Sequence, residues 1–107
     1  MTLKAMKERL VREYIEEFTQ AVFYAQVLGQ KEIPLDEEQR ALYKGALRDH
    51  DTAFNALSRV LCGSYLESGY RKENHKYFDA RIEASLEAQR RFETWLALRK
   101  EDRRDAE

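Results

Sequence analysis

The stretch from Tyr14 to Leu28, YIEEFTQAVFYAQVL, is the most apolar and aromatic part of a chain that is otherwise dominated by charge. In and before this stretch, apolar side chains recur at steps of three or four, at Leu3, Met6, Leu10, Tyr14, Phe18, Ala21, Ala25 and Leu28. This spacing places them along one side of an α-helix. Near the end, AVFYAQVL leaves a single polar residue, so we expect this part of the helix to be covered on more than one side.

The composition indicates a single helical domain. A chain of 107 residues can bury one hydrophobic core but is too short for two. Charged residues make up 36% and hydrophobic residues 43%, with one proline and four glycines, which is typical of long helices. The 19 basic and 20 acidic residues nearly cancel, so no overall positive field attracts the chain to nucleic acid or to a membrane.

We expect a cytoplasmic location from the cysteine content and the N-terminal sequence. The chain has one cysteine, Cys62, which allows neither an internal disulfide nor a cysteine-based zinc site. The first residues, MTLKAMKERLVREYIEE, carry charges every few positions. This pattern predicts neither a signal peptide nor a membrane anchor.

Local signals delimit the first two helices. The first is predicted over residues 2–28, with Thr2 as its N-cap and Gly29 ending it in a left-handed conformation. Pro34 interrupts the following segment, and Asp36 with Gln39 has the spacing of a capping box.

The second helix is therefore predicted over residues 36–62, with an extension to 68 as the alternative. Gly45 lies inside it, at a cost of about 1 kcal/mol relative to alanine, and could permit a close helix approach. Its apolar positions fall at helical spacing, at Leu42, Tyr43, Ala46, Leu47, Ala53, Phe54, Leu57, Val60 and Leu61.

The third helix is predicted over residues 74–99, with Asn74 as its N-cap and a frayed C-terminal tail at 100–107. One face is defined by Phe78, Ile82, Leu86 and Leu96, and beside it lie Tyr77, Ala84, Ala88, Phe92 and Trp95. This stripe is broader than a coiled-coil seam, as expected for a helix that touches two others. The sequence thus predicts an all-α, antiparallel three-helix bundle with long helices in one domain, 1–107.

The sequence offers little support for catalysis or metal binding. No Glu-x-x-His pair is present, and the glycines form no phosphate-binding loop. His50 could serve as a general base or pH switch between Asp49 and Asp51. A partly buried histidine with a hydrogen-bonded neighbour is the favoured interpretation, because no nucleophile motif accompanies it. We expect no catalytic residues, no metal site and no cofactor.

Basic residues recur every fourth position on the second helix and near the end of the third. Such like-charge rows cost a few tenths of a kcal/mol per pair in an isolated helix, so something should compensate. Because the two rows lie at the same pole of an antiparallel bundle, they could contact nucleic acid through Arg40, Lys44, Arg48, Lys100, Arg103 and Arg104. The alternative is internal ion pairing, of Glu17 and Glu83 with Arg48, and of Glu87 with Lys44.

Aromatic residues give the strongest sign of an interface. Trp95 has an arginine one helical turn to either side, which is the composition of binding hot spots. The predicted protein interface consists of Tyr77, Arg91, Phe92, Trp95 and Arg99.

The leading hypothesis is a non-enzymatic protein interaction module, acting as an adaptor, assembly factor or stoichiometric inhibitor, including those carried by phages and mobile elements. The apolar stripes are wider than three helices require. Pairing of two copies, as a homodimer forming a larger bundle or coiled coil, would bury the excess. The second hypothesis is a nucleic-acid-binding regulator.

Overall fold

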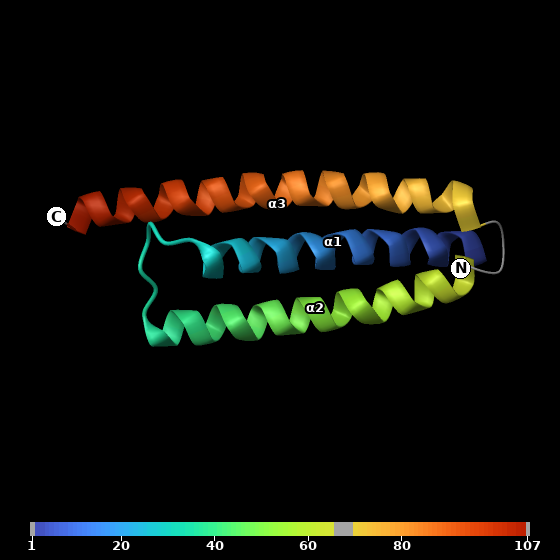
Figure 1. Cartoon of the computed structure of the whole chain (residues 1–107), viewed down its shortest axis with the longest axis horizontal. Helices are drawn as coiled ribbons and strands as arrows, with labels where there is room; N and C mark the ends of the chain where they lie inside the picture. Colours follow the sequence, from blue (N-terminus) through green and yellow to red (C-terminus); the bar gives the residue numbers. More distant parts are fainter. Residues whose placement is uncertain (1, 66–69, 107) are drawn as a thin grey trace.

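The computed structural model shows an all-α fold of three long helices (Figure 1). It describes residues 2–65 and 70–106, with side chains at 2–61 and 81–102. The helices are α1 (Leu3–Gly29), α2 (Glu37–Tyr65) and α3 (Tyr70–Ala106). No strand occurs in these described ranges. The predicted three-helix bundle is confirmed.

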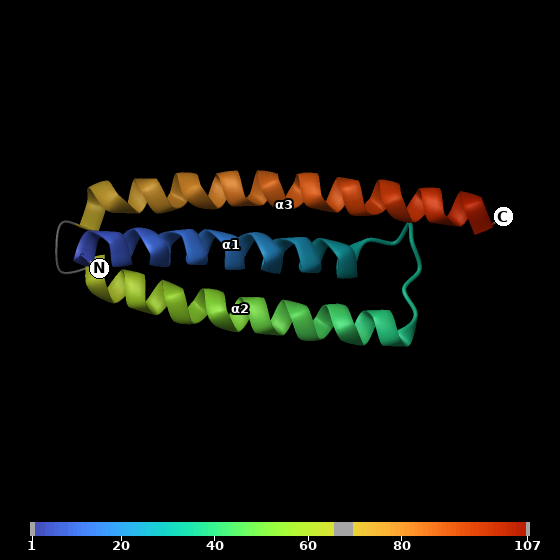
Figure 2. The ribbon, with the colours of Figure 1, turned by 180° about the vertical axis from the view of Figure 1, so that it is seen from behind.

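Helix α1 lies between the other two, and both outer helices pack against it (Figures 1 and 2). α1 and α3 run in the same direction, while α2 runs in the opposite one. The start of α2 and the end of α3 therefore share one pole, as predicted. The molecule is elongated, with extents of 58 × 25 × 22 Å.

Two predicted caps are confirmed. The Thr2 hydroxyl accepts a hydrogen bond from the Ala5 backbone N–H at 3.1 Å, which starts α1. At the start of α2, the Asp36 carboxylate accepts from the Gln39 N–H at 2.7 Å. The Gln39 side chain accepts in return from the Asp36 N–H at 3.2 Å. This reciprocal pair is a capping box.

The end of α1 differs from the prediction. Gly29 is still helical, and the capping residue is Gln30 in an extended conformation, with φ −76° and ψ 154°. The Gln30 side-chain amide spans the turn, donating to the Ile33 carbonyl at 2.6 Å and accepting from the Ile33 N–H at 2.8 Å. A side chain thus supplies the turn that a left-handed glycine was expected to supply.

The end of α2 lies between the two predicted ends, 62 and 68, and α3 is longer than predicted at both ends. α2 continues past Gly63 to Tyr65, and residues 66–69 lie outside the described part of the chain. α3 starts at Tyr70 rather than Asn74, and it includes the segment to Ala106 that was predicted to be frayed. The physical reason is that KEDRRDA contains no glycine or proline and several good helix formers.

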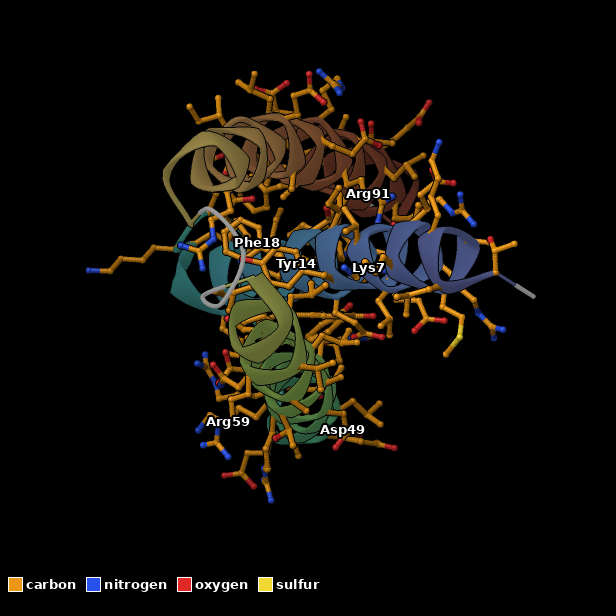
Figure 3. All side chains as sticks on the ribbon, turned by 90° about the vertical axis from the view of Figure 1, so that its right-hand side faces the viewer. Lys7, Tyr14, Phe18, Asp49, Arg59 and Arg91 are labelled. Carbon is orange, nitrogen blue, oxygen red and sulfur yellow. The ribbon has the colours of Figure 1, made fainter. Side chains whose placement is uncertain are left out.

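The core is centred on α1, which is covered on more than one side, as expected. Tyr14, Ala21 and Val27 are buried, and so is Thr19, whose hydroxyl donates to the Ile15 carbonyl at 2.8 Å. The Tyr14 ring stacks on Phe54 of α2 with centroids 4.9 Å apart. Figure 3 shows Tyr14 among the three helices.

The residues of α3 that face inward differ from the predicted ones. Ala84 and Ala88 are 2% and 0% exposed, whereas Ile82 and Leu86 are 49% and 55% exposed. Small side chains allow α3 to approach α1 closely, and this packing turns the larger aliphatic residues outward. The side chain of Phe78 lies outside the described residues.

Candidate interaction surface

Aromatic and basic side chains connect α2 to α3 on the inner side of the bundle. The Tyr43 hydroxyl of α2 accepts hydrogen bonds from Trp95 Nε1 at 3.3 Å and from the Arg99 guanidinium at 3.2 Å. Arg99 also lies 5.6 Å from the Trp95 ring centroid, a cation–π distance. The indole N–H of Trp95 and one guanidinium nitrogen of Arg99 are therefore bound within the chain.

Arg91 connects α3 to α1 through carboxylates. Its guanidinium donates to the two Glu16 oxygens at 3.1 and 3.3 Å, and to Glu87 at 3.3 Å. The bonds to Glu16 raise the pKa of Arg91. Hydrogen bonds from Arg90 and then Arg91 lower the pKa of Glu87. These ion pairs are partly or fully exposed, so each contributes little to stability.

Four residues of the predicted interface thus lie on one side of α3, at intermediate exposure: Arg91, Phe92, Trp95 and Arg99. The side chain of Tyr77 lies outside the described residues. The four side chains contact α1, α2 or one another, so their polar groups already have partners in the bundle. Their role in binding another protein stays a prediction.

His50 is a partly buried histidine with a hydrogen-bonded neighbour. Its Nδ1 lies 2.5 Å from Glu17 Oε2 of α1, and its ring stacks on Tyr24 with centroids 5.6 Å apart. The predicted pairing of Glu17 with Arg48 is therefore wrong, because Glu17 faces the side of α2 that carries His50.

One side of α2, next to its core-facing residues, carries a mainly apolar row that is largely exposed, with Ala46 and Ala53 half-buried. Leu42 and Val60 are 68% and 51% exposed. Between them, on the same face, lie smaller side chains and one carboxylate. We call this row the α2 seam; it consists of Leu42, Ala46, Asp49, Ala53, Ala56 and Val60. A shallow surface depression adjoins its first half, lined by Glu38, Ala41, Leu42, Gly45, Ala46 and Asp49.

Charged side chains lie within and beside the α2 seam, and they have no ion-pair partner among the described residues. Glu38, Asp49 and Arg59 are exposed, and none makes an ion pair with a described residue. Asp49 and Arg59 point away from α1 and α3 in Figure 3. A methyl group placed at Gly45 would meet nothing within 4 Å, so this glycine makes no close helix contact inside the bundle.

The two basic rows have different surroundings. Arg40, Lys44 and Arg48 on α2 are exposed, and none forms an ion pair with a described residue. Lys100 is neutralised by Glu32 at 2.7 Å, and the side chains at 103 and 104 lie outside the described residues. Glu87 binds Arg90 and Arg91 rather than the predicted Lys44.

The described residues form neither a metal cluster nor a membrane-spanning helix. None of their His, Cys, Asp and Glu side chains gather in a group of three or more that could hold a metal ion. Within the same part of the chain, no helix has an apolar stretch long enough to cross a lipid bilayer.

The α2 seam was not singled out from the sequence, although a signal for it exists. Its residues follow one another at steps of 4, 3, 4, 3 and 4, which is the heptad spacing of a coiled coil. The signal was masked because Tyr43, Leu47 and Phe54, which face the core, belong to the same broad apolar stripe.

Comparison with known proteins found no matching family model, no curated protein and no solved structure.

Proposed function

We propose that this protein is a non-enzymatic, cytoplasmic interaction module that presents the outward face of α2 to another polypeptide chain. The observation that carries the proposal is the α2 seam, a largely exposed, mainly apolar row at coiled-coil spacing. The charges along it form no ion pair with a described residue. Scattered apolar side chains are normal on protein surfaces. A regular row along one helix has the arrangement that a partner helix requires.

The exposed apolar pair near the middle of α3 supports a partner less well. On α3, Ile82 and Leu86 lie one turn apart, but the next positions on that face are Gln89 and Glu93. The apolar row there is therefore short. Leu86 and Leu42 are both exposed leucines on outer helices, which makes Leu86 a matched control for Leu42.

The test is affinity capture from the native host with three baits: the wild-type chain, Leu42→Asp and Leu86→Asp. A binding chain, whether another protein or a second copy, should be retained by wild type and by Leu86→Asp and lost with Leu42→Asp. Both substitutions replace exposed residues, so neither should unfold the protein. Identical captured sets for all three baits would contradict the proposal.

A second candidate function is nucleic-acid binding by the basic row of α2. It is supported by the exposure of Arg40, Lys44 and Arg48 and by their lack of ion pairs with described residues. Three phosphate contacts would make the binding strongly salt-dependent.

A mobility shift at low salt tests this candidate. Replacing all three basic residues by glutamine should abolish a shift with DNA or RNA, whereas Leu42→Asp should leave it unchanged. Absence of a shift for the wild-type protein would eliminate nucleic-acid binding.

A further inference from the structure

We propose that the α2 seam pairs with the α2 seam of a second copy, antiparallel, in a two-stranded coiled coil. The inference rests on the proposed function and names the partner. The charges that flank the seam and the sizes of the side chains within it support this pairing.

The charges along one edge of the seam are complementary to those on the same edge of a second copy that runs in the opposite direction. Glu38, Gly45, Thr52 and Arg59 are spaced seven residues apart along one edge. In an antiparallel pair these positions meet their own counterparts in reverse order. Glu38 then lies beside Arg59 of the second copy, and Gly45 beside Thr52. A twofold axis repeats each contact, which gives two opposite-charge pairs.

A parallel pair lacks this complementarity. There, the same edge would meet the opposite edge of the seam, at Tyr43, His50 and Leu57. These three side chains are partly buried in the bundle, and His50 already contacts Glu17. Glu38 and Arg59 would have no charged partner, so charge pairing favours the antiparallel arrangement.

The sizes of the four central seam residues fit the same register, whereas Ala56 and Val60 lie beyond them, opposite Gln39 and Leu35 of the second copy. Leu42 lies opposite Ala53 of the second copy, so a large side chain meets a small one. Ala46 lies opposite Asp49 at the centre, and the open space beside Gly45 lets the second helix approach closely. The two Asp49 carboxylates come near each other at the axis, where their repulsion weakens the pairing. A polar residue in a seam also opposes shifts of register.

Analytical ultracentrifugation of the purified full chain, over a range of concentrations, tests the proposal. The wild type and the Leu86→Asp control should dimerise, and Leu42→Asp should remain monomeric. Asp49→Ala should tighten the dimer, because it removes the two like charges from the axis. A wild-type chain that stays monomeric to millimolar concentration, or a dimer insensitive to Leu42→Asp, would overturn the proposal.

Charge exchange tests the direction of pairing. Glu38→Arg and Arg59→Glu should each weaken the dimer on the order of tenfold, because each places like charges together. The double variant restores two opposite-charge pairs and should recover wild-type affinity. Failure of the double variant to recover would refute the antiparallel register.

The outcomes separate this inference from the proposed function. A monomeric chain whose capture of another protein is lost with Leu42→Asp would refute self-pairing while leaving the interaction module intact. A monomeric chain with no seam-dependent capture would refute both.

Discussion

At the scale of single residues, the bundle is held in register by side chains with two partners each. Tyr43 receives hydrogen bonds from both Trp95 and Arg99, and Arg91 joins α3 to Glu16 while also binding Glu87. Contacts of this kind contribute little individually. Their importance is geometric, because each fixes the rotation of one helix relative to another.

Tyr43→Phe should destabilise the fold by about 1 kcal/mol, since it leaves the donors of Trp95 and Arg99 without their acceptor. Tyr24→Phe is the matched control, because the Tyr24 hydroxyl has no hydrogen bond to a described residue. Urea denaturation followed by circular dichroism measures both. Equal stabilities of the two variants would show that the Tyr43 hydroxyl has no structural role.

Arg90→Gln should raise the pKa of the Glu87 carboxyl, because hydrogen bonding from Arg90 is the main cause of its lowered value. A pH titration followed by carboxyl NMR measures this change. A lowered folded-state pKa stabilises the fold above the unfolded pKa, and this stabilisation is lost as pH falls through the folded value. Glu87→Gln should therefore reduce the loss of stability in acid. An unchanged titration of Glu87 in Arg90→Gln would refute the assignment.

At the scale of helices, the packing of α1 against α3 depends on small side chains. Ala84 and Ala88 are almost fully buried at this contact. Protein interiors are densely packed, so a larger residue here has no room without displacing a helix. The same contact directs Ile82 and Leu86 toward solvent.

Ala88→Leu should cost about 1–3 kcal/mol, because it overpacks the contact between α1 and α3. Ala97→Leu makes the same change at an exposed position of the same helix and should be nearly neutral. Denaturation midpoints, compared at equal m-values, measure the difference. Similar midpoints for the two variants would contradict the observed rotation of α3.

At the scale of the whole molecule, only the middle helix of this arrangement is covered by a neighbouring helix on two sides. α1 is covered by both neighbours, whereas α2 and α3 each keep an outward face (Figures 1 and 2). On α2 that face carries the apolar seam. Exposed large apolar side chains occur on all three helices, and those of α2 belong to a row at heptad spacing.

Small-angle X-ray scattering should distinguish a side-by-side dimer from an end-to-end dimer. Antiparallel pairing along α2 sets two copies side by side, so the longest dimension should remain close to the 58 Å of one chain. The cross-section should widen instead. A maximum dimension near twice that length would indicate end-to-end association and contradict pairing through the α2 seam.

The sequence by itself determined the three helices and the start signals of the first two, because these depend on neighbouring residues. The Thr2 cap, the capping box of Asp36 and Gln39, and the helical periodicity are all local features. The end of α1 was missed because a side-chain turn formed by Gln30 replaced the expected glycine. The end of α3 differs from the prediction because the charged C-terminal residues are themselves good helix formers.

Only the tertiary structure decided which side of each helix faces inward. Successive residues differ by about 100° around a helix, so a small rotation exchanges buried and exposed side chains. On α3, the sequence allowed either the stripe with Ala88 or the stripe with Leu86 to face α1. In the structure the stripe with Ala88 is buried and Leu86 is exposed. In the same way, the rotation of α2 relative to α1 paired Glu17 with His50 instead of Arg48. Contacts between helices depend on packing of the whole bundle, which no local pattern specifies.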